Sequence, residues 1–145
     1  MLRWLCGLLL LALGCAGAAH ALTGEEARAL AIGEPDARLA ALEGIVAHAD
    51  ERTVALLQAL AEDAVKASAS SVFVIKDGMG HDPVTGAEVP VPGDAEDVVN
   101  NNLLRSGIDN ALAAIRLFSS DAGQRAAAVK TLQDDLDEAR LPLVE

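Results

Sequence analysis

The chain has 145 residues, a length typical of one domain, and its side chains are 52% hydrophobic but only 2% aromatic. Alanine and leucine supply most of the apolar content, which favours closely packed helices. The formal net charge of −11 argues against binding to nucleic acid or to an anionic lipid surface, because both attract lysine and arginine.

Residues 1–21 have the three parts of a secretory signal peptide. Arg3 supplies the positive start, Trp4–Leu13 is a short apolar run, and Ala19-His20-Ala21 matches an A-x-A cleavage site. The run is shorter than the ~20 residues that cross a bilayer. Leu13-Gly14-Cys15 weakly resembles a lipoprotein cleavage box, but Ala12 stands where such boxes usually carry leucine. We therefore expect an exported chain, cleaved after Ala21, whose mature part has no cysteine.

Residues 22–67 are predicted to form a short helix followed by a helical hairpin. Thr23 and Glu26 have the spacing of a capping box, Pro35 suits a first helical turn, and Asp50 is placed to cap the next helix. Apolar residues recur at three- and four-residue steps along both hairpin helices, which places them on inward faces. These residues are Leu39, Leu42, Ile45, Val46, Val54, Leu57 and Leu60, with Ala61 and Val65 as further candidates.

Residues 68–93 are predicted to be a β-hairpin insertion between helical hairpins. Val72–Ile75 is rich in β-branched and aromatic residues, and the Asp77-Gly78 pair after it is a strong signal for a tight turn. Ala87–Val89 is a possible third strand. Because two or three short strands are unstable alone in water, we expect them to rest on the helices.

Residues 94–145 are predicted to be helical again. Asp94–Asp97 reads as an acidic helix start, which the helix dipole favours, although Asn100–Asn102 leave the exact start uncertain. One apolar stripe runs along the following helix, and its members are Leu104, Ile108, Ala111, Leu112, Ile115 and Phe118.

An apparent internal repeat sets the predicted fold. The segment Arg38–Gln58 aligns without a gap with Arg125–Glu145, and the same apolar face is kept in both copies. The matched structural positions are Arg38, Asp50 and Leu56 in the first copy and Arg125, Asp137 and Leu143 in the second. A repeated helix, acidic turn and helix is typical of stacked helical hairpins. The predicted fold is therefore mainly α, a HEAT-like α-solenoid with a small β-hairpin insertion, in which Arg38 and Arg125 pair with carboxylates of a neighbouring hairpin.

The second copy stops partway along its second helix, with an apolar face that no capping unit covers. We therefore expect a fragment or truncated product of a longer protein.

Few residues suggest chemistry. His48 has no second metal ligand at a suitable spacing, and Asp77, His81 and Asp82 lack the spacing and terminal glutamate of a calcium loop. Ser119 and Ser120 have no nucleophile elbow around them. Carboxylate pairs such as Glu25/Glu26, Asp50/Glu51 and Asp134/Asp135 fall at predicted helix starts or turns, where capping explains them. We expect no catalytic, cofactor or metal site, and hence no enzyme.

Several segments, in this order along the chain, resemble the N-terminal region of the urea ABC transporter permease in the form that has a long extracytoplasmic extension. The likeness covers nearly the whole mature chain, and its most specific parts are Val72–Gly78 and Asp94–Arg105. The segments are ALTGEEARALAIGEPDARLAAL, DERTVALLQAL, VFVIKDG, DPVTG, DAEDVVNNNLLR, ALAAIRLF and DAGQRAAAVKTLQ.

The resemblance implies a HEAT-like extension in the periplasm, held at the inner membrane only through a multi-spanning permease of the branched-chain amino acid transporter type. It also implies protein partners, namely a second permease, two ATPase subunits and a periplasmic urea-binding protein. No membrane span follows residue 21, so urea transport would belong to the parent protein and this chain would be its non-catalytic part. The alternative is a stand-alone secreted module that binds a protein through its concave face or its β-insertion.

Overall fold

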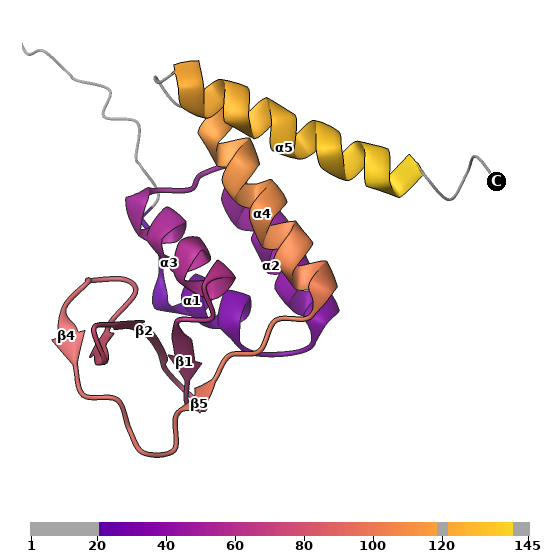
Figure 1. Ribbon diagram of the computed structural model, residues 1–145. Coiled ribbons are helices and arrows are strands. Elements are labelled where there is room, and N and C mark those ends of the chain that lie inside the picture. The colour runs from indigo at the N-terminus through magenta and orange to yellow at the C-terminus, as the bar shows by residue number, and fades with distance from the viewer. Residues whose placement is uncertain (1–20, 119–121, 141–145) are drawn as a thin grey trace, which may run out of the picture.

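The computed structural model describes residues 21–118 and 122–140, and within these ranges it contains five helices and one sheet of five strands. The helices are α1 (Gly24–Ala31), α2 (Pro35–Val46), α3 (Glu51–Ala61), α4 (Asn102–Leu117) and α5 (Ala122–Arg140). The strands are β1 (Val65–Ala67), β2 (Val72–Lys76), β3 (Met79–His81), β4 (Glu88–Val89) and β5 (Glu96–Asp97). Figure 1 shows the sheet at one end of the molecule and α5 near the other.

The first three helices begin where the sequence predicts. Thr23 and Glu26 form a reciprocal capping box, in which each side chain accepts a hydrogen bond from the backbone amide of the other residue. Pro35 is the first residue of α2. Asp50 caps α3, because its Oδ1 accepts hydrogen bonds from the backbone amide and the hydroxyl of Thr53 at 2.7 and 2.8 Å. Each of these signals involves side chains only a few residues apart, which is why the sequence alone reveals them.

The strands form one antiparallel sheet in the order β4-β3-β2-β1-β5. The predicted hairpin of β2 and β3 is part of its centre, and the two residues of its turn, Asp77 and Gly78, have φ values of 52° and 78°. Two positive φ values in succession are what a tight type I′ turn requires. The sheet also includes β1 and β5, which lie outside residues 68–93. It is therefore a structural layer assembled from both sides of that segment, and the prediction of a small hairpin insertion was wrong.

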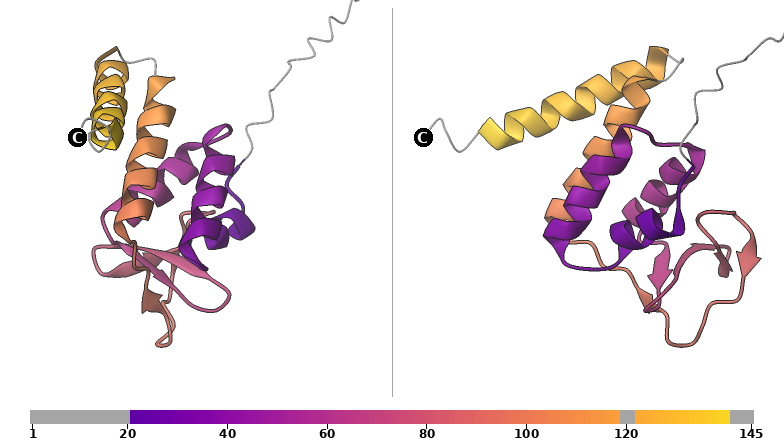
Figure 2. Two further views of the ribbon diagram at one scale, coloured as in Figure 1. Left: turned by 90° about the vertical axis from the view of Figure 1, so that its right-hand side faces the viewer. Right: turned by 180° about the vertical axis from the view of Figure 1, so that it is seen from behind.

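The core lies between helices α1–α4 and extends to the sheet where α1 and α3 pack against β2 (Figure 2). Leu56, Leu57 and Leu60 of α3 are at most 1% exposed. From the sheet, Val72 and Val74 of β2 belong to the same core cluster, as expected for residues two apart on one face of a strand. Burial of each large aliphatic side chain contributes about 1.5–3 kcal/mol to stability, so this cluster holds the sheet to the helices.

The predicted α-solenoid is contradicted because the two supposed repeat copies have different structures. In the first copy, Arg38–Gln58 spans α2, a turn and α3, and Asp50 stands outside the helices as a cap. In the second copy, the backbone from Arg125 through Asp137 belongs to one uninterrupted helix, α5. Apolar residues at three- and four-residue steps satisfy either arrangement, so their shared pattern does not specify a hairpin. The fold is a mixed one of helices and an antiparallel sheet. Leu143 lies outside the described residues.

Two expectations for residues 94–118 were also wrong. Glu96 and Asp97 form a strand, and the helix begins at Asn102, where the side chain of Asn101 accepts a hydrogen bond from the amide of Leu104 at 2.8 Å. Leu104, Ile108, Ala111 and Leu112 of the predicted stripe are buried, and Ile115 is half-buried. Phe118 is instead 90% exposed, because it follows the last residue of α4, where the helical spacing no longer determines its direction.

Helix α5 packs on α4 (Figures 1 and 2). Ala128 is 2% exposed at this contact, and Leu132, one turn further along, is half-buried. The rest of α5 extends past α4 and away from the sheet. The helices therefore pack in an irregular arrangement in which the main contact of α5 among the described residues is with α4, unlike a stack of equivalent hairpins.

Candidate functional site

A buried arginine joins four parts of the chain. The side chain of Arg38 in α2 is 5% exposed and donates from Nε to the carbonyl of Leu30 at 2.8 Å, from one terminal nitrogen to the carbonyl of Val99 at 3.1 Å, and from the other to Oδ1 of Asn100 at 2.5 Å. The amide nitrogen of Asn100 then donates to the carbonyl of Leu60 at the end of α3, at 2.8 Å. This Arg38–Asn100 network thus ties α1, α2, α3 and the connection between β5 and α4 together.

The charge of Arg38 is held by neutral acceptors. Its hydrogen-bond partners among the described residues are two carbonyl oxygens and one amide oxygen, in place of the carboxylate that the repeat model predicted. Burial lowers the pKa of Arg38, because desolvation disfavours the charged form. The pKa of an arginine is ordinarily so far above neutral that the guanidinium remains charged at neutral pH. Because hydrogen bonds from a charged donor are stronger than neutral ones, this network stabilises the packing of the segments that it connects.

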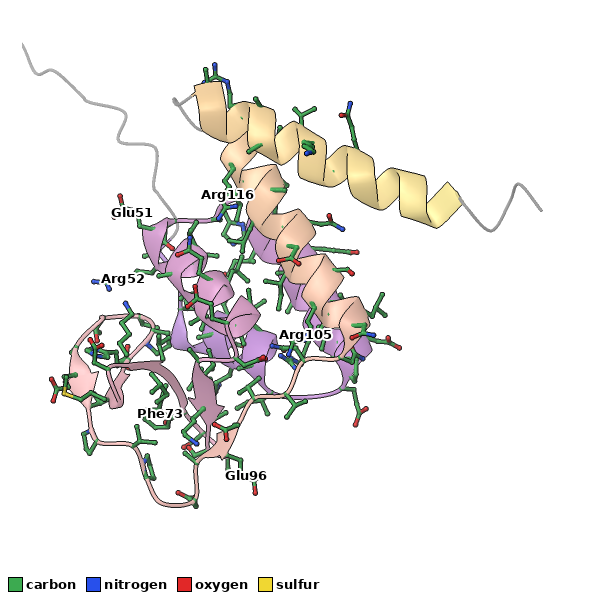
Figure 3. All side chains as sticks on the ribbon, in the orientation of Figure 1. Glu51, Arg52, Phe73, Glu96, Arg105 and Arg116 are labelled. Carbon is green, nitrogen blue, oxygen red and sulfur yellow. The ribbon has the colours of Figure 1, made fainter. Side chains whose placement is uncertain are left out.

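Arg105 extends the network to the surface. Its Nε donates to the carbonyl of Asn100 at 3.3 Å, and one terminal nitrogen contacts both carboxylate oxygens of Asp63 at 2.7 and 2.8 Å. Figure 3 shows Arg105 beside the connection that leads into α4. Asp63 has a φ of 55°, in the left-handed region just after α3. This exposed ion pair contributes at most about 1 kcal/mol to stability, so its main effect is to orient the start of α4.

A groove of about 540 Å³ lies next to this network, and we call it the β5 groove. Its walls come from the end of α1, from the turn between β1 and β2, and from β5 with the residues around it. The lining residues are Ala31, Ile32, Gly33, Arg38, Ala67, Ser68, Ala69, Asp94, Glu96, Asp97, Val98 and Val99. Ile32 is 37% exposed and Val99 is 79% exposed, so the groove presents apolar surface to solvent.

The rim of the β5 groove is acidic. Asp94, Glu96 and Asp97 are all exposed, and Asp97 forms an ion pair with Lys66 at 2.7 Å. No hydrogen bond or ion pair links the side chain of Asp94 or Glu96 to another described residue. In Figure 3, Glu96 points away from the sheet into solvent. The groove thus combines apolar walls with two exposed carboxylates, those of Asp94 and Glu96, that form no ion pair with another described residue.

The other residues that the sequence singled out have structural surroundings. His48 lies 3.3 Å from Glu26 on the surface. Asp82 stabilises its own turn, since its Oδ1 accepts hydrogen bonds from the backbone amides of Val84 and Thr85. Near it, His81 lies 3.5 Å from the carbonyl of Gly86. Ser119 and Ser120 lie outside the described residues.

The matched repeat residues are not brought together as equivalent positions. Arg38 and Leu56 are buried and Asp50 caps α3, whereas Arg125 is exposed on α5. Asn100, which sequence reasoning left as part of an uncertain helix start, is the central residue of the buried network. A run of three asparagines at a helix boundary was the available signal, but its partners are at least 40 positions away.

Over residues 21–118 and 122–140, no three or more histidine, cysteine, aspartate or glutamate side chains come together as a metal site. Within the same part of the chain, every helix is too short or too polar to cross a bilayer. Comparison with protein-family models, curated proteins and solved structures finds no match to this chain.

Proposed function

We propose that this chain is the non-catalytic, extracytoplasmic part of a urea ABC transporter permease. The observation that carries the proposal is the ordered set of segments that resemble that family, above all Val72–Gly78 and Asp94–Arg105. The first of these forms β2 and its turn, and the second runs from β5 through the start of α4. The HEAT-like fold that the resemblance implied is not present, so the proposal rests on these segments and not on fold.

In this role the domain acts through protein contacts on the outer side of the inner membrane. The chemistry of moving urea belongs to the membrane part of the parent permease, with a second permease subunit and two ATPases. A periplasmic urea-binding protein would be the soluble partner closest to this domain. The exposed β5 groove supports a binding role, because exposed apolar surface beside polar residues is typical of interaction sites.

Urea uptake in the source organism tests the proposal. The codons for residues 22–145 are deleted in frame from the chromosome, and uptake of ¹⁴C-urea is compared with uptake of ¹⁴C-leucine. We expect urea uptake to fall at least fivefold while leucine uptake stays within twofold, since only the urea system would lose a component. Unchanged urea uptake would reject the proposal.

Export is tested with alkaline phosphatase, which is active only outside the cytoplasm. The enzyme is fused after Phe118 in a chain with residues 1–21 and in a matched chain that lacks residues 2–21. The first fusion should be active and the second inactive. Activity at the same low level in both would contradict a periplasmic location.

The β5 groove is also compatible with the alternative function, that of a stand-alone secreted module that binds a protein. The two functions are distinguished by expressing this chain from a plasmid in the deletion strain. If the chain is a stand-alone module, the deletion leaves urea uptake unchanged, and the plasmid reverses any other growth defect that the deletion causes.

A further inference from the structure

We propose that the open edge of β5, together with the β5 groove, binds an extended protein segment in which lysine or arginine alternates with apolar residues. The bound segment would add a strand to the sheet. This inference depends on the described residues alone and stands whether or not the chain belongs to a urea transporter.

The register of β5 leaves one residue with backbone groups that face outward. Lys66 is paired with Asp97 and Ala67 with Glu96, and the amide of Val98 donates to the carbonyl of Val65. Backbone groups alternate between the two sides of a strand. Since Val98 faces β1, Asp97 must present its amide and carbonyl to the open side, where β5 is the last strand of the sheet. These two groups form the start of a ladder for an added strand.

The open edge ends at Val99, two residues after Asp97. The carbonyl of Val99 accepts a hydrogen bond from Arg38, so that group is already satisfied within the protein. Arg38 also lines the groove, and because it occupies the carbonyl of Val99, an added strand could not bond the edge beyond that residue. Ile32 and Val99 stand on either side with exposed apolar surface. Alternate side chains of an added strand would point toward this surface.

The opposite edge of the sheet is closed in a different way. Strand β4 is followed directly by Pro90, which has no amide to donate, and Pro92 follows two residues later. Val91 lies so close to β3 that a methyl group added at Gly80 would clash with its side chain. Proline is a common protection of sheet edges. No proline occurs between Gly93 and Asn100, so β5 lacks this protection.

The charge on the rim identifies the occupant. Asp94 and Glu96 are exposed carboxylates with no ion pair to another described residue, and the whole chain carries a net charge of −11. A basic segment is attracted to this rim, whereas a second copy of this chain would bring the same acidic residues to the contact and be repelled. The groove therefore favours a basic partner over self-association.

Binding of a defined peptide to the full mature chain tests the inference. The probe is a fluorescein-labelled peptide of eight residues in which lysine and valine alternate. Its binding is measured by fluorescence anisotropy at 50 mM and 300 mM salt. A peptide of alternating glutamate and valine controls for charge. A third peptide has the first sequence with N-methyl groups on alternate residues, so that it keeps its charge but cannot form a strand ladder.

Two double variants with equal loss of charge locate the site. Asp94→Asn with Glu96→Gln removes the unpaired rim charges, and Asp36→Asn with Glu43→Gln removes one aspartate and one glutamate from the exposed surface of α2. We expect the rim variant to bind the lysine peptide at least tenfold more weakly and the α2 variant to bind within twofold of wild type. The N-methylated peptide should also bind at least tenfold more weakly. In amide NMR spectra, signals of Ile32, Asp97 and Val99 should shift on binding.

Three results would overturn the inference. Equal weakening by both double variants would show attraction to the acidic surface in general. Equal binding of the N-methylated peptide would exclude strand addition. If no peptide binds and the rim variant self-associates in analytical ultracentrifugation, the acidic residues serve only to protect an exposed edge. None of these results depends on urea uptake, so failure here is distinguishable from failure of the proposed function.

Discussion

The guanidinium of Arg38 and the side-chain amide of Asn100 meet at 2.5 Å in the interior, although the two residues are 62 positions apart. Each is 5% exposed, and each also bonds a backbone carbonyl at the end of a helix, that of Leu30 for Arg38 and that of Leu60 for Asn100. The pair therefore fixes the position at which the chain leaves the sheet and enters α4.

The three consecutive asparagines at this point should differ sharply in their contribution to stability. Asn100→Ala leaves buried donors and acceptors of Arg38 and Leu60 unsatisfied and should lower the free energy of unfolding by about 2–4 kcal/mol. Asn101→Ala removes the cap of α4 and should cost about 1 kcal/mol. Asn102→Ala, at an exposed helical position, should change stability by less than about 0.5 kcal/mol. Urea unfolding followed by circular dichroism measures all three, and equal losses would refute the network.

The cap at Asp50 should make stability depend on pH. Burial raises the pKa of Asp50, but hydrogen bonds from Thr53 and from the amide of Leu22 together lower it below its ordinary value. A lowered pKa means that this stabilisation is complete above the unfolded value of about 3.9 and is lost as the pH falls through the folded value.

The variant Asp50→Asn isolates this effect, because it keeps one cap oxygen but cannot ionise. At pH 7 we expect it to be less stable than wild type by about 1 kcal/mol. The difference should shrink between pH 5 and pH 2 in urea unfolding experiments. A difference that is the same at both ends of this range would mean that ionisation of Asp50 makes no contribution.

Two glycines within helices should respond in opposite ways to alanine. Gly44 in α2 has open space where a methyl group would go, so Gly44→Ala should stabilise the fold by about 0.5–1 kcal/mol. A methyl group at Gly107 in α4 would come within 2.8 Å of Leu39 and 3.2 Å of Leu42, so Gly107→Ala should give no gain or a loss. In a Leu39→Ala background, Gly107→Ala should become favourable. Thermal unfolding measures the stability of Gly44→Ala, Gly107→Ala, Leu39→Ala and the double variant. If Gly107→Ala is no more favourable in the Leu39→Ala background, the packing of α2 on α4 described above is wrong.

Substitutions at two positions of the predicted α4 stripe, Leu112 and Phe118, should differ strongly in their effect on stability. Leu112 is 6% exposed in the core, and Leu112→Ala should cost roughly 2–5 kcal/mol. Phe118 is 90% exposed, and Phe118→Ser should change the free energy of unfolding by less than about 0.5 kcal/mol. Denaturant midpoints provide the measurement. A large loss for Phe118→Ser would show that its ring is covered.

The sequence by itself determined the features that depend on neighbours along the chain. The capping box at Thr23, the cap at Asp50 and the Asp77-Gly78 turn need partners only a few residues away, and each is present as predicted. Helical spacing also identified most of the buried positions of α2, α3 and α4.

Tertiary structure decided everything that depends on distant partners. The acidic segment around Glu96 is a strand because β1 offers it a hydrogen-bonding edge, an influence stronger than its preference for a helix start. Likewise, Asn100 is buried because Arg38 and Leu60 surround it, and the β5 groove exists only because α1 and β5 end near each other. The apolar pattern shared by Arg38–Gln58 and Arg125–Glu145 predicted the same buried face in both copies, but Leu42 and Ile45 are buried whereas the matched Val129 is 44% exposed and Leu132 is half-buried. The pattern also does not specify whether the chain turns, because apolar residues at three- and four-residue steps are compatible with one continuous helix as well as with two shorter ones.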